Sequence, residues 1–492
     1  MTEPAADSIN DAPKPLLLLR LLRPAVTIPA VVVSLIAVAP IIYRSSQFSG
    51  IPPIDPIVDP EVDGRVTLSD NENAFTFYKL AVSLLPTASG AIDIRSGIAA
   101  IDSDQQWDDV PEDVRDHLDR CQAALTEWKL GTGLDDAHYL DVADFSYSTQ
   151  LPLTQDLRTF SHLAALQALR ALDQGDADES WVWLRAYLKS SRHAGAHGVA
   201  IERLVGTALH AGAARSIVYW ARRPEVTSEQ LQRALKEIRE IDRLTPKASV
   251  TLKAEAIVAS NVLDNSRDTG MLIRNRRIRA GLIPAYLFIK GDPQLSRELI
   301  RHVFANYLSQ CDKSPCDRVN AARLIGLYRP TGKESPPLMD PDKLYEAVMN
   351  SLIAFHLVPS FSQLVLVFDI ERSRQDALEL CLLVEMYRRK HGDYPETLQS
   401  LVPEFIADVP VDWMGSSPTD KMLLVRRNVE VPLLESDVSE SGKTASRPCL
   451  IIYGRGRVAG DNGGDLDDYA DVGLRILLPD AGSHDETAMP SS

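Results

Sequence analysis

The sequence predicts a mainly α-helical protein with an N-terminal transmembrane helix, a multi-helix domain of stacked hairpins, and a small C-terminal α+β module made of a long helix and an antiparallel sheet. Three observations predict this. A single long uncharged apolar run lies near the N-terminus, helical spacing of apolar residues recurs from about residue 67 to residue 357, and β-rich segments appear only near the C-terminus. Aromatic residues make up only 6% of the 492 residues, which favours helices packed through small aliphatic side chains.

The only run long enough to cross a membrane is residues 25–43, AVTIPAVVVSLIAVAPIIY, which holds 19 residues and no charge. About 20 apolar residues are needed to cross a hydrocarbon core. Lys14, Arg20 and Arg23 precede the run, and the segment after Arg44 is acidic. The positive-inside rule therefore predicts a cytoplasmic tail at residues 1–24, a single span in the cell inner membrane, and an extracytoplasmic location for the rest. A cleaved signal peptide is the alternative, but the run is long for one and no A-x-A site follows it.

Residues 44–66 form a predicted linker, in which the four prolines between Pro52 and Pro60 favour an extended spacer. Residues 67–357 form the predicted helical domain. Its clearest pattern is LRTFSHLAALQALRALDQGDADESWVWLRAYLKSS, in which two segments with apolar faces flank Gly175. This pattern predicts a helical hairpin, the unit that stacks into helical repeats. The hairpin resembles the tetratricopeptide type, of which the chain carries one copy.

Charge and cysteine content exclude several classes of protein. The formal net charge of −16 repels a phosphate backbone, so no nucleic acid is expected as a partner. The five cysteines are too few and too scattered for a disulfide framework. Cys311 and Cys316, in CDKSPC, could close a small loop in an oxidising compartment or remain two thiols.

Two further features are candidates for function. His193 and His197, in RHAGAH, could share one helix face as zinc ligands, but a metalloprotease needs Glu where Ala194 stands, and ordinary polar contacts are the alternative. The basic segment at residues 271–291, MLIRNRRIRAGLIPAYLFIKG, could lie on an anionic membrane surface or form an exposed linker. Because no G-x-S-x-G, Walker, Rossmann or H-E-x-x-H motif occurs in the sequence, no catalytic residue is assigned and no catalysis is expected.

Residues 358–479 form the predicted C-terminal module, and residues 480–492 a disordered tail. A long helix is expected at 361–389, ending at KHGDYP because Gly392 can adopt the left-handed C-cap conformation and Pro395 cannot continue a helix. PETLQSLVPEF predicts a short second helix. Alternating or β-rich runs predict strands at 422–426, 450–453 and 472–478.

The order of short motifs in this module resembles the globular part of the major pseudopilins of type II secretion systems, and similar tails on anchored proteins of planctomycete-like bacteria. The residues that carry the resemblance are Tyr394-Pro395, Leu398, Leu401-Val402, Pro410, Asp412, Gly415, Tyr453-Gly454 and the segment GDNGGDLDDYADVGLRI from Gly460. They span about 120 of the 492 residues. The anchor RPAVTIPAVVV lacks the pseudopilin leader and the Gly-Phe-Thr-Leu-Ile-Glu-like start, so assembly into a filament is not expected.

The resemblance also implies a calcium site in the acidic loop, since carboxylates on a Gly-rich backbone supply hard oxygen ligands. The alternative is a solvated acidic turn. The candidate ligands are Asp461, Asp465, Asp467, Asp468 and Asp471.

Taken together, the sequence predicts a membrane-anchored extracytoplasmic interaction or scaffold protein of the bacterial envelope that binds a protein partner and needs no cofactor unless calcium binds. Stacked helical hairpins present the binding surfaces that such a role requires. An envelope hydrolase with a non-motif acidic or His-based site is the alternative, and a secretion-filament component is a further one.

Overall fold

The computed structural model describes residues 58–86, 106–146, 148–265, 293–318, 346–348, 351, 354–357, 361–432, 444–456 and 461–478. The predicted tail at 1–24, span at 25–43, basic segment at 271–291 and C-terminal tail at 480–492 lie outside these residues. Among the described residues, no helix combines the length and apolarity needed to cross a membrane.

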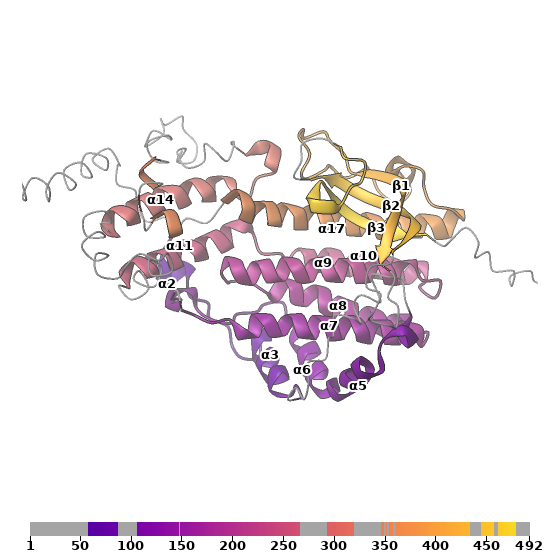
Figure 1. The fold of residues 1–492 in the computed structure, drawn as a ribbon, viewed down its shortest axis with the longest axis horizontal. Coiled ribbons are helices and arrows are strands. Elements are labelled where there is room, and N and C mark those ends of the chain that lie inside the picture. The colour runs from indigo at the N-terminus through magenta and orange to yellow at the C-terminus, as the bar shows by residue number, and fades with distance from the viewer. Residues whose placement is uncertain are drawn as a thin grey trace, which may run out of the picture.

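The chain is mainly helical with a small C-terminal antiparallel sheet, which confirms that part of the predicted fold class. The helices are α2 (Pro60–Asp63), α3 (Ala74–Ser83), α5 (Glu112–Arg120), α6 (Gln122–Thr132), α7 (Pro152–Asp173), α8 (Ala177–His193), α9 (Ala200–Arg222), α10 (Ser228–Asp242), α11 (Ala248–Asp264), α14 (Pro293–Gln310), α16 (Ala354–Leu357) and α17 (Phe361–His391). The strands are β1 (Leu423–Pro432), β2 (Thr444–Arg455) and β3 (Asp471–Leu477), paired in the order β1-β2-β3. Figure 1 shows the sheet on one side of α17, with α9, α8 and α7 in successive layers on the other side.

The predicted helical hairpin is present as α7 and α8. Gly175 adopts a positive φ of 79° in the turn, and Asp176 caps α8 by accepting a hydrogen bond from the Glu179 backbone N–H at 2.9 Å. Leu163 and Leu166 of α7 are fully buried. The third helix, α9, packs against both members of the hairpin, so α7, α8 and α9 form a stack whose far face meets α17 and β3.

One hydrophobic core joins the helical layers to the sheet. It contains Trp128 of α6 and Leu157 of α7 together with Leu380 of α17, Ile452 of β2 and Leu474 of β3. A second core joins α11 and α14 to the first turns of α17. Since α17 belongs to both cores, the core does not divide at residue 358, where the sequence predicts the start of a separate module.

Two local predictions differ from the structure. The end of the predicted linker is not extended: α2 forms a helical turn with Pro60 at its first position, and Asp63 accepts a hydrogen bond from Lys253 of α11 at 2.7 Å. PETLQSLVPEF forms a single 3₁₀ turn, Leu398–Leu401, in place of an α-helix. The 3₁₀ turn brings Leu398 and Leu401, three residues apart, to the same face, where both are buried in the core.

The predicted glycine cap of α17 is confirmed, because Gly392 has a φ of 84° and its N–H donates to the carbonyl of Arg388 at 2.8 Å. No heavy atom lies within 4 Å of a Cβ built at this position. A side chain there would therefore clash with no neighbour, and its only cost would be the left-handed backbone conformation. We therefore expect Gly392→Ala to lower the free energy of unfolding by about 1 kcal/mol. Urea denaturation checks this value. Gly392→Asn is the matched variant and should cost less, because Asn tolerates the left-handed conformation better than Ala; an Asn variant as unstable as the Ala variant would contradict the explanation.

Candidate functional site

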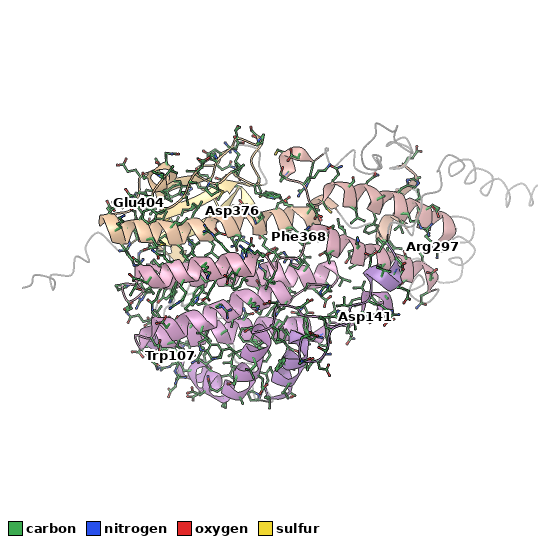
Figure 2. The ribbon with its side chains drawn as sticks, turned by 180° about the vertical axis from the view of Figure 1, so that it is seen from behind. Trp107, Asp141, Arg297, Phe368, Asp376 and Glu404 are labelled. Carbon is green, nitrogen blue, oxygen red and sulfur yellow. The ribbon has the colours of Figure 1, made fainter. Side chains whose placement is uncertain are left out.

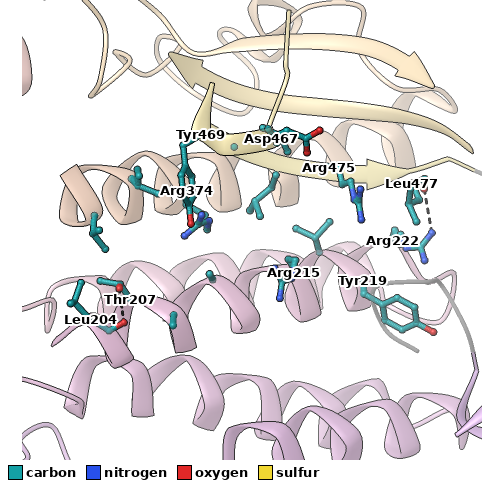
Figure 3. Close-up of a pocket in the computed structure, with 18 residues that line it drawn as sticks. Leu204, Thr207, Arg215, Tyr219, Arg222, Arg374, Asp467, Tyr469, Arg475 and Leu477 are labelled. Atoms are coloured by element: carbon teal, nitrogen blue, oxygen red, sulfur yellow. Dashed lines mark hydrogen bonds between the residues drawn. The ribbon is translucent and has the colours of Figure 1, made fainter. Parts of the chain in front are cut away.

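A cavity of about 820 Å³ lies between α9, α17 and β3, and Figure 3 shows the residues that line it. This volume lies in the range of small-molecule and cofactor sites, about 300–1,000 Å³. The α9 wall follows from residue spacing, since Ala208, Ala211, Arg215, Val218 and Arg222 recur at three, four or seven residues and so share one helix face. The two alanines leave room on this face. Because the side chain of Ala208 is exposed, the cavity opens to solvent.

Four arginines from three elements line this cavity, which we call the arginine cavity. Arg215 and Arg222 lie on α9, Arg374 on α17 and Arg475 on β3, while Asp467 is the one carboxylate among the lining residues. Figure 3 shows Arg374 beside Tyr469 at one end, Arg222 beside Leu477 at the other, and Arg215 and Arg475 between them. In a chain whose net charge is −16, this concentrates positive charge at one place and makes the cavity attractive to anions.

Burial lowers the pKa of two of these guanidinium groups, those of Arg374 and Arg222. Burial lowers the pKa of Arg374, and the charge of Arg215 lowers it further. Burial likewise lowers the pKa of Arg222 to about 10, so the side chain stays charged at neutral pH. Arg222 Nη1 donates to the carbonyl of Leu477 at 3.3 Å. Within the described parts of the chain, the guanidinium groups of Arg374 and Arg475 form no hydrogen bond or ion pair.

A buried ion network holds α17 against the helical layers behind the cavity. Glu371 of α17 accepts hydrogen bonds from Arg192 of α8 at 2.5 Å and from Arg203 of α9, and Arg192 also donates to Asp242 of α10 at 3.2 Å. The side chains of Arg192, Arg203 and Glu371 are at most 3% exposed. Because Glu371 and Arg374 are three residues apart on α17, this network fixes the cavity wall that carries Arg374.

The neighbouring His210 and Gln375 complete the network. His210 Nε2 lies 3.0 Å from Gln375 Oε1. Burial lowers the pKa of His210 to about 3, and the charge of Arg192 adds to this effect. His210 is therefore neutral at physiological pH and acts as a hydrogen-bond donor to the Gln375 amide oxygen. It adds no further positive charge to the two buried arginines.

The structure does not place His193 and His197 on one helix face, because α8 ends at His193. His193 uses both ring nitrogens: Nδ1 lies 2.5 Å from the Tyr78 hydroxyl and Nε2 lies 3.0 Å from the carbonyl of Leu134. Burial lowers its pKa to about 4. His197 lies 2.7 Å from Asp136 Oδ1, and the space near the two histidines measures about 10 Å³. The described residues therefore favour the interpretation of ordinary polar contacts.

The acidic loop that the pseudopilin resemblance links to calcium is organised by two of its own carboxylates. Asp461 accepts hydrogen bonds from the Tyr453 hydroxyl at 3.0 Å and from the Gly463 N–H at 2.8 Å. Asp471 is buried and accepts from the backbone N–H groups of Asn462 and Gly464.

The other three candidates lie beside them in the same loop. Asp465 accepts a hydrogen bond from the Asp467 N–H at 3.0 Å, and both Asp467 and Asp468 belong to the 3₁₀ turn Asp467–Tyr469. Among the described residues no group of three or more His, Cys, Asp or Glu side chains is placed to hold a metal ion. Calcium binding stays a prediction.

The two cysteines of the CDKSPC segment are thiols in this structure. Cys311 is buried and Cys316 is exposed. Burial raises the pKa of the Cys311 thiol to about 12, and its Sγ lies 3.7 Å from the carbonyl of Leu308. Cys316 Sγ lies 3.1 Å from Ser314 Oγ. Closure of this loop in an oxidising compartment stays a prediction.

Sequence reasoning missed the arginine cavity, although one signal was present. Arg215 and Arg222 are seven residues apart and share a helix face with Ala208, Ala211 and Val218. A cationic pair on a small apolar face is unusual for a solvated helix surface and could have marked α9. Nothing local marks Arg374 or Arg475, which reach the site only through the packing of α17 and β3.

Comparison with known proteins found no similar protein. No family model, no curated protein and no solved structure matches the chain.

Asp376 of α17 is a partly buried carboxylate, 15% exposed at its side chain, whose oxygen lies 3.3 Å from Arg372. Its pKa rises to about 7, mainly through burial, because the charge of Arg372 only partly opposes the shift and nearby carboxylates add to it, namely those of Glu379, Asp242 and Asp412. Figure 2 shows Asp376 midway along α17. A raised carboxyl pKa favours the folded state most below the unfolded pKa of about 3.8, and this contribution is lost as pH rises through about 7.

The quantity to compare is the free energy of unfolding of wild type minus that of Asp376→Asn. We expect this difference to fall by about 2 kcal/mol between pH 5 and pH 8. Urea denaturation at both pH values measures the change in this difference. Asp408→Asn is the control, because Asp408 is exposed and paired with Lys421. A constant difference between wild type and Asp376→Asn across this pH range would show that the carboxyl does not titrate there.

Proposed function

We propose that this chain is a membrane-anchored interaction protein of the bacterial envelope, which exposes its helical layers and C-terminal sheet outside the cytoplasm and binds a protein partner in the arginine cavity. The proposed membrane anchor is the apolar run at 25–43, and the charges on either side of this run give its orientation. The cavity is the observation that supports a binding role, because four arginines and a strand edge line about 820 Å³ of space that is open to solvent.

The chemistry of the cavity supports binding in preference to catalysis. Half of its polar lining residues are arginines, and the others are Thr207, Tyr219, Tyr469 and Asp467. Guanidinium groups bind carboxylates and phosphates by paired hydrogen bonds but are poor proton donors and acceptors at neutral pH. The buried network of Glu371, Arg192 and Arg203 supplies a rigid wall for this surface.

Site-specific photocrosslinking in native membranes tests the proposal. A photoreactive residue replaces Ala208, which lines the cavity and is exposed, or Lys236 of α10, whose side chain is 79% exposed and lies outside it. We expect one crosslinked protein from position 208 and none of that protein from position 236. The same product should weaken when Arg374→Glu is added to the Ala208 variant.

Three outcomes would overturn the proposal. The first is equal crosslinking from both positions. The second is recovery of the chain in the soluble fraction after alkaline extraction of membranes, which would remove the anchor. The third is metal-dependent hydrolysis by the purified full chain that is lost in His193→Ala or His197→Ala, because it would support the envelope hydrolase instead.

A further inference from the structure

Strand β3 forms one edge of the described sheet and borders the arginine cavity. The sheet order is β1-β2-β3, so β3 pairs with β2 alone among the described strands. The Leu478 N–H donates to the carbonyl of Pro448 on β2 at 2.9 Å. Because backbone groups of alternate residues point to opposite edges of a strand, those of Leu477, Arg475 and Gly473 point away from β2. Arg222 confirms this direction, since it donates to the Leu477 carbonyl from the side of α9.

The edge groups of Gly473 and Arg475 therefore face the cavity. In the described part of the chain, no hydrogen bond joins them to α9 or to another strand. An unpaired edge of this kind is a template for another strand. Extended peptides bind many proteins by adding to such an edge, where the main chain supplies affinity and alternate side chains supply specificity.

The cavity also determines which side chains such a strand would carry. Along an added strand, side chains alternate between the two faces. The lining offers guanidinium groups from Arg215, Arg374 and Arg475, and apolar surface from Ile370 and Leu474. Acidic side chains would pair with the arginines, and apolar side chains between them would cover the aliphatic surface.

We infer that the arginine cavity binds an extended peptide segment of a partner protein, in which acidic and apolar residues alternate, and that this segment adds to the free edge of β3. The inference rests on the proposed function and names its ligand. Carboxylates near Arg374 and Arg475 would also offset the mutual repulsion of the guanidinium groups that line the cavity. The main chain of the segment would supply partners for the edge groups of Gly473 and Arg475.

The test uses the full chain in detergent micelles and a fluorescein-labelled seven-residue peptide in which Glu and Val alternate. Fluorescence anisotropy measures binding. We expect saturable binding, at least about tenfold weaker binding to Arg475→Glu and Arg374→Glu, and unchanged binding to Arg158→Glu. Arg158 is an exposed residue of α7 outside the cavity. A peptide in which Lys replaces Glu should not bind wild type.

Two N-methylated peptides test strand addition on the wild-type chain, so no variant has to fold. One carries the methyl groups on its Glu nitrogens and the other on its Val nitrogens, which blocks one edge or the other of the strand. We expect one of the two to lose binding and the other to retain it. Retention by both would overturn the strand addition. Displacement of the parent peptide by tripolyphosphate at an equal concentration of charge would show a small-anion site instead.

Failure of this inference can be told from failure of the proposed function. If none of the peptides binds while the crosslink from position 208 persists, the cavity contacts a partner through other chemistry, and only the peptide inference falls. If both the peptide and the crosslink fail, the cavity is not the binding surface and both proposals fall.

Discussion

Replacing Glu371 by Gln is expected to lower the free energy of unfolding by about 3–5 kcal/mol, because it leaves two buried guanidinium groups without their shared carboxylate. Arg192 and Arg203 are 1% and 2% exposed at their side chains, and water cannot take the place of the lost charge. Urea denaturation followed by circular dichroism measures the loss. Since Glu371 also fixes the α17 wall of the arginine cavity, the variant should bind the acidic peptide more weakly as well.

Glu379→Gln is the matched control on the same helix. Its partner, Arg239, is 49% exposed and lies 2.7 Å away, and exposed pairs of this kind contribute about 0–1 kcal/mol. A second comparison adds Arg203→Met to Glu371→Gln. The double variant should regain part of the stability, because Arg192 keeps Asp242 as its partner. Equal losses in Glu371→Gln and Glu379→Gln would contradict the role assigned to the network.

The Glu371 carboxylate also predicts that the protein loses stability at low pH. Burial alone would raise the pKa of Glu371, but the charges of Arg203 and Arg192 outweigh burial and hold the pKa at about 2. A depressed carboxyl pKa contributes stability that is complete above the unfolded value of about 4.5 and is lost as pH falls toward about 2. In Glu371→Gln this part of the pH dependence should disappear.

Replacing Trp128 by Ala is the second large expected effect, with a loss of about 3–5 kcal/mol for the cavity it leaves in the core. The Trp128 side chain is 0% exposed and stacks on Phe160 with ring centroids 6.1 Å apart. Its indole Nε1 is buried without a hydrogen-bond partner among the described residues.

Trp128→Phe separates the two contributions of this side chain. Phe retains the stacked ring and removes the unpaired N–H, so we expect less than half of the loss seen with Ala. Trp107→Ala is the control, because Trp107 is only partly buried and contacts Arg170 at 5.7 Å; it should cost about 1 kcal/mol. A Phe variant as unstable as the Ala variant would mean that ring size, and not the buried N–H, decides the outcome.

Several elements follow from short stretches of sequence alone. The α7 and α8 hairpin follows from leucines at helical spacing on either side of Gly175, and the end of α17 follows from Gly392 and Pro395. All three strands of the sheet lie where β-rich runs predict them. These predictions succeed because the responsible interactions are local: a glycine with positive φ and an apolar residue every third or fourth position act within a few residues.

Other elements needed more than local pattern. PETLQSLVPEF has the composition of a helix start, yet the burial of Leu398 and Leu401 against the core limits it to one 3₁₀ turn. His193 and His197 have the spacing of a helical pair, yet α8 ends between them. In the first case tertiary burial decided between structures that the pattern allowed. In the second the cause is local, because Gly195 adopts a positive φ of 77° just after the end of α8.

The candidate site itself was decided by the tertiary structure. Glu371 lies 179 residues from Arg192 and 168 from Arg203 along the chain, and the arginine cavity gathers side chains from α9, α17 and β3. Sequence spacing carries no information about which charges meet across such separations, because helix packing and strand register decide it. The sequence by itself determined most of the helices, the strands and the apolar run at 25–43. Only the packing of α17 and β3 against α9 brought the four arginines of the cavity together.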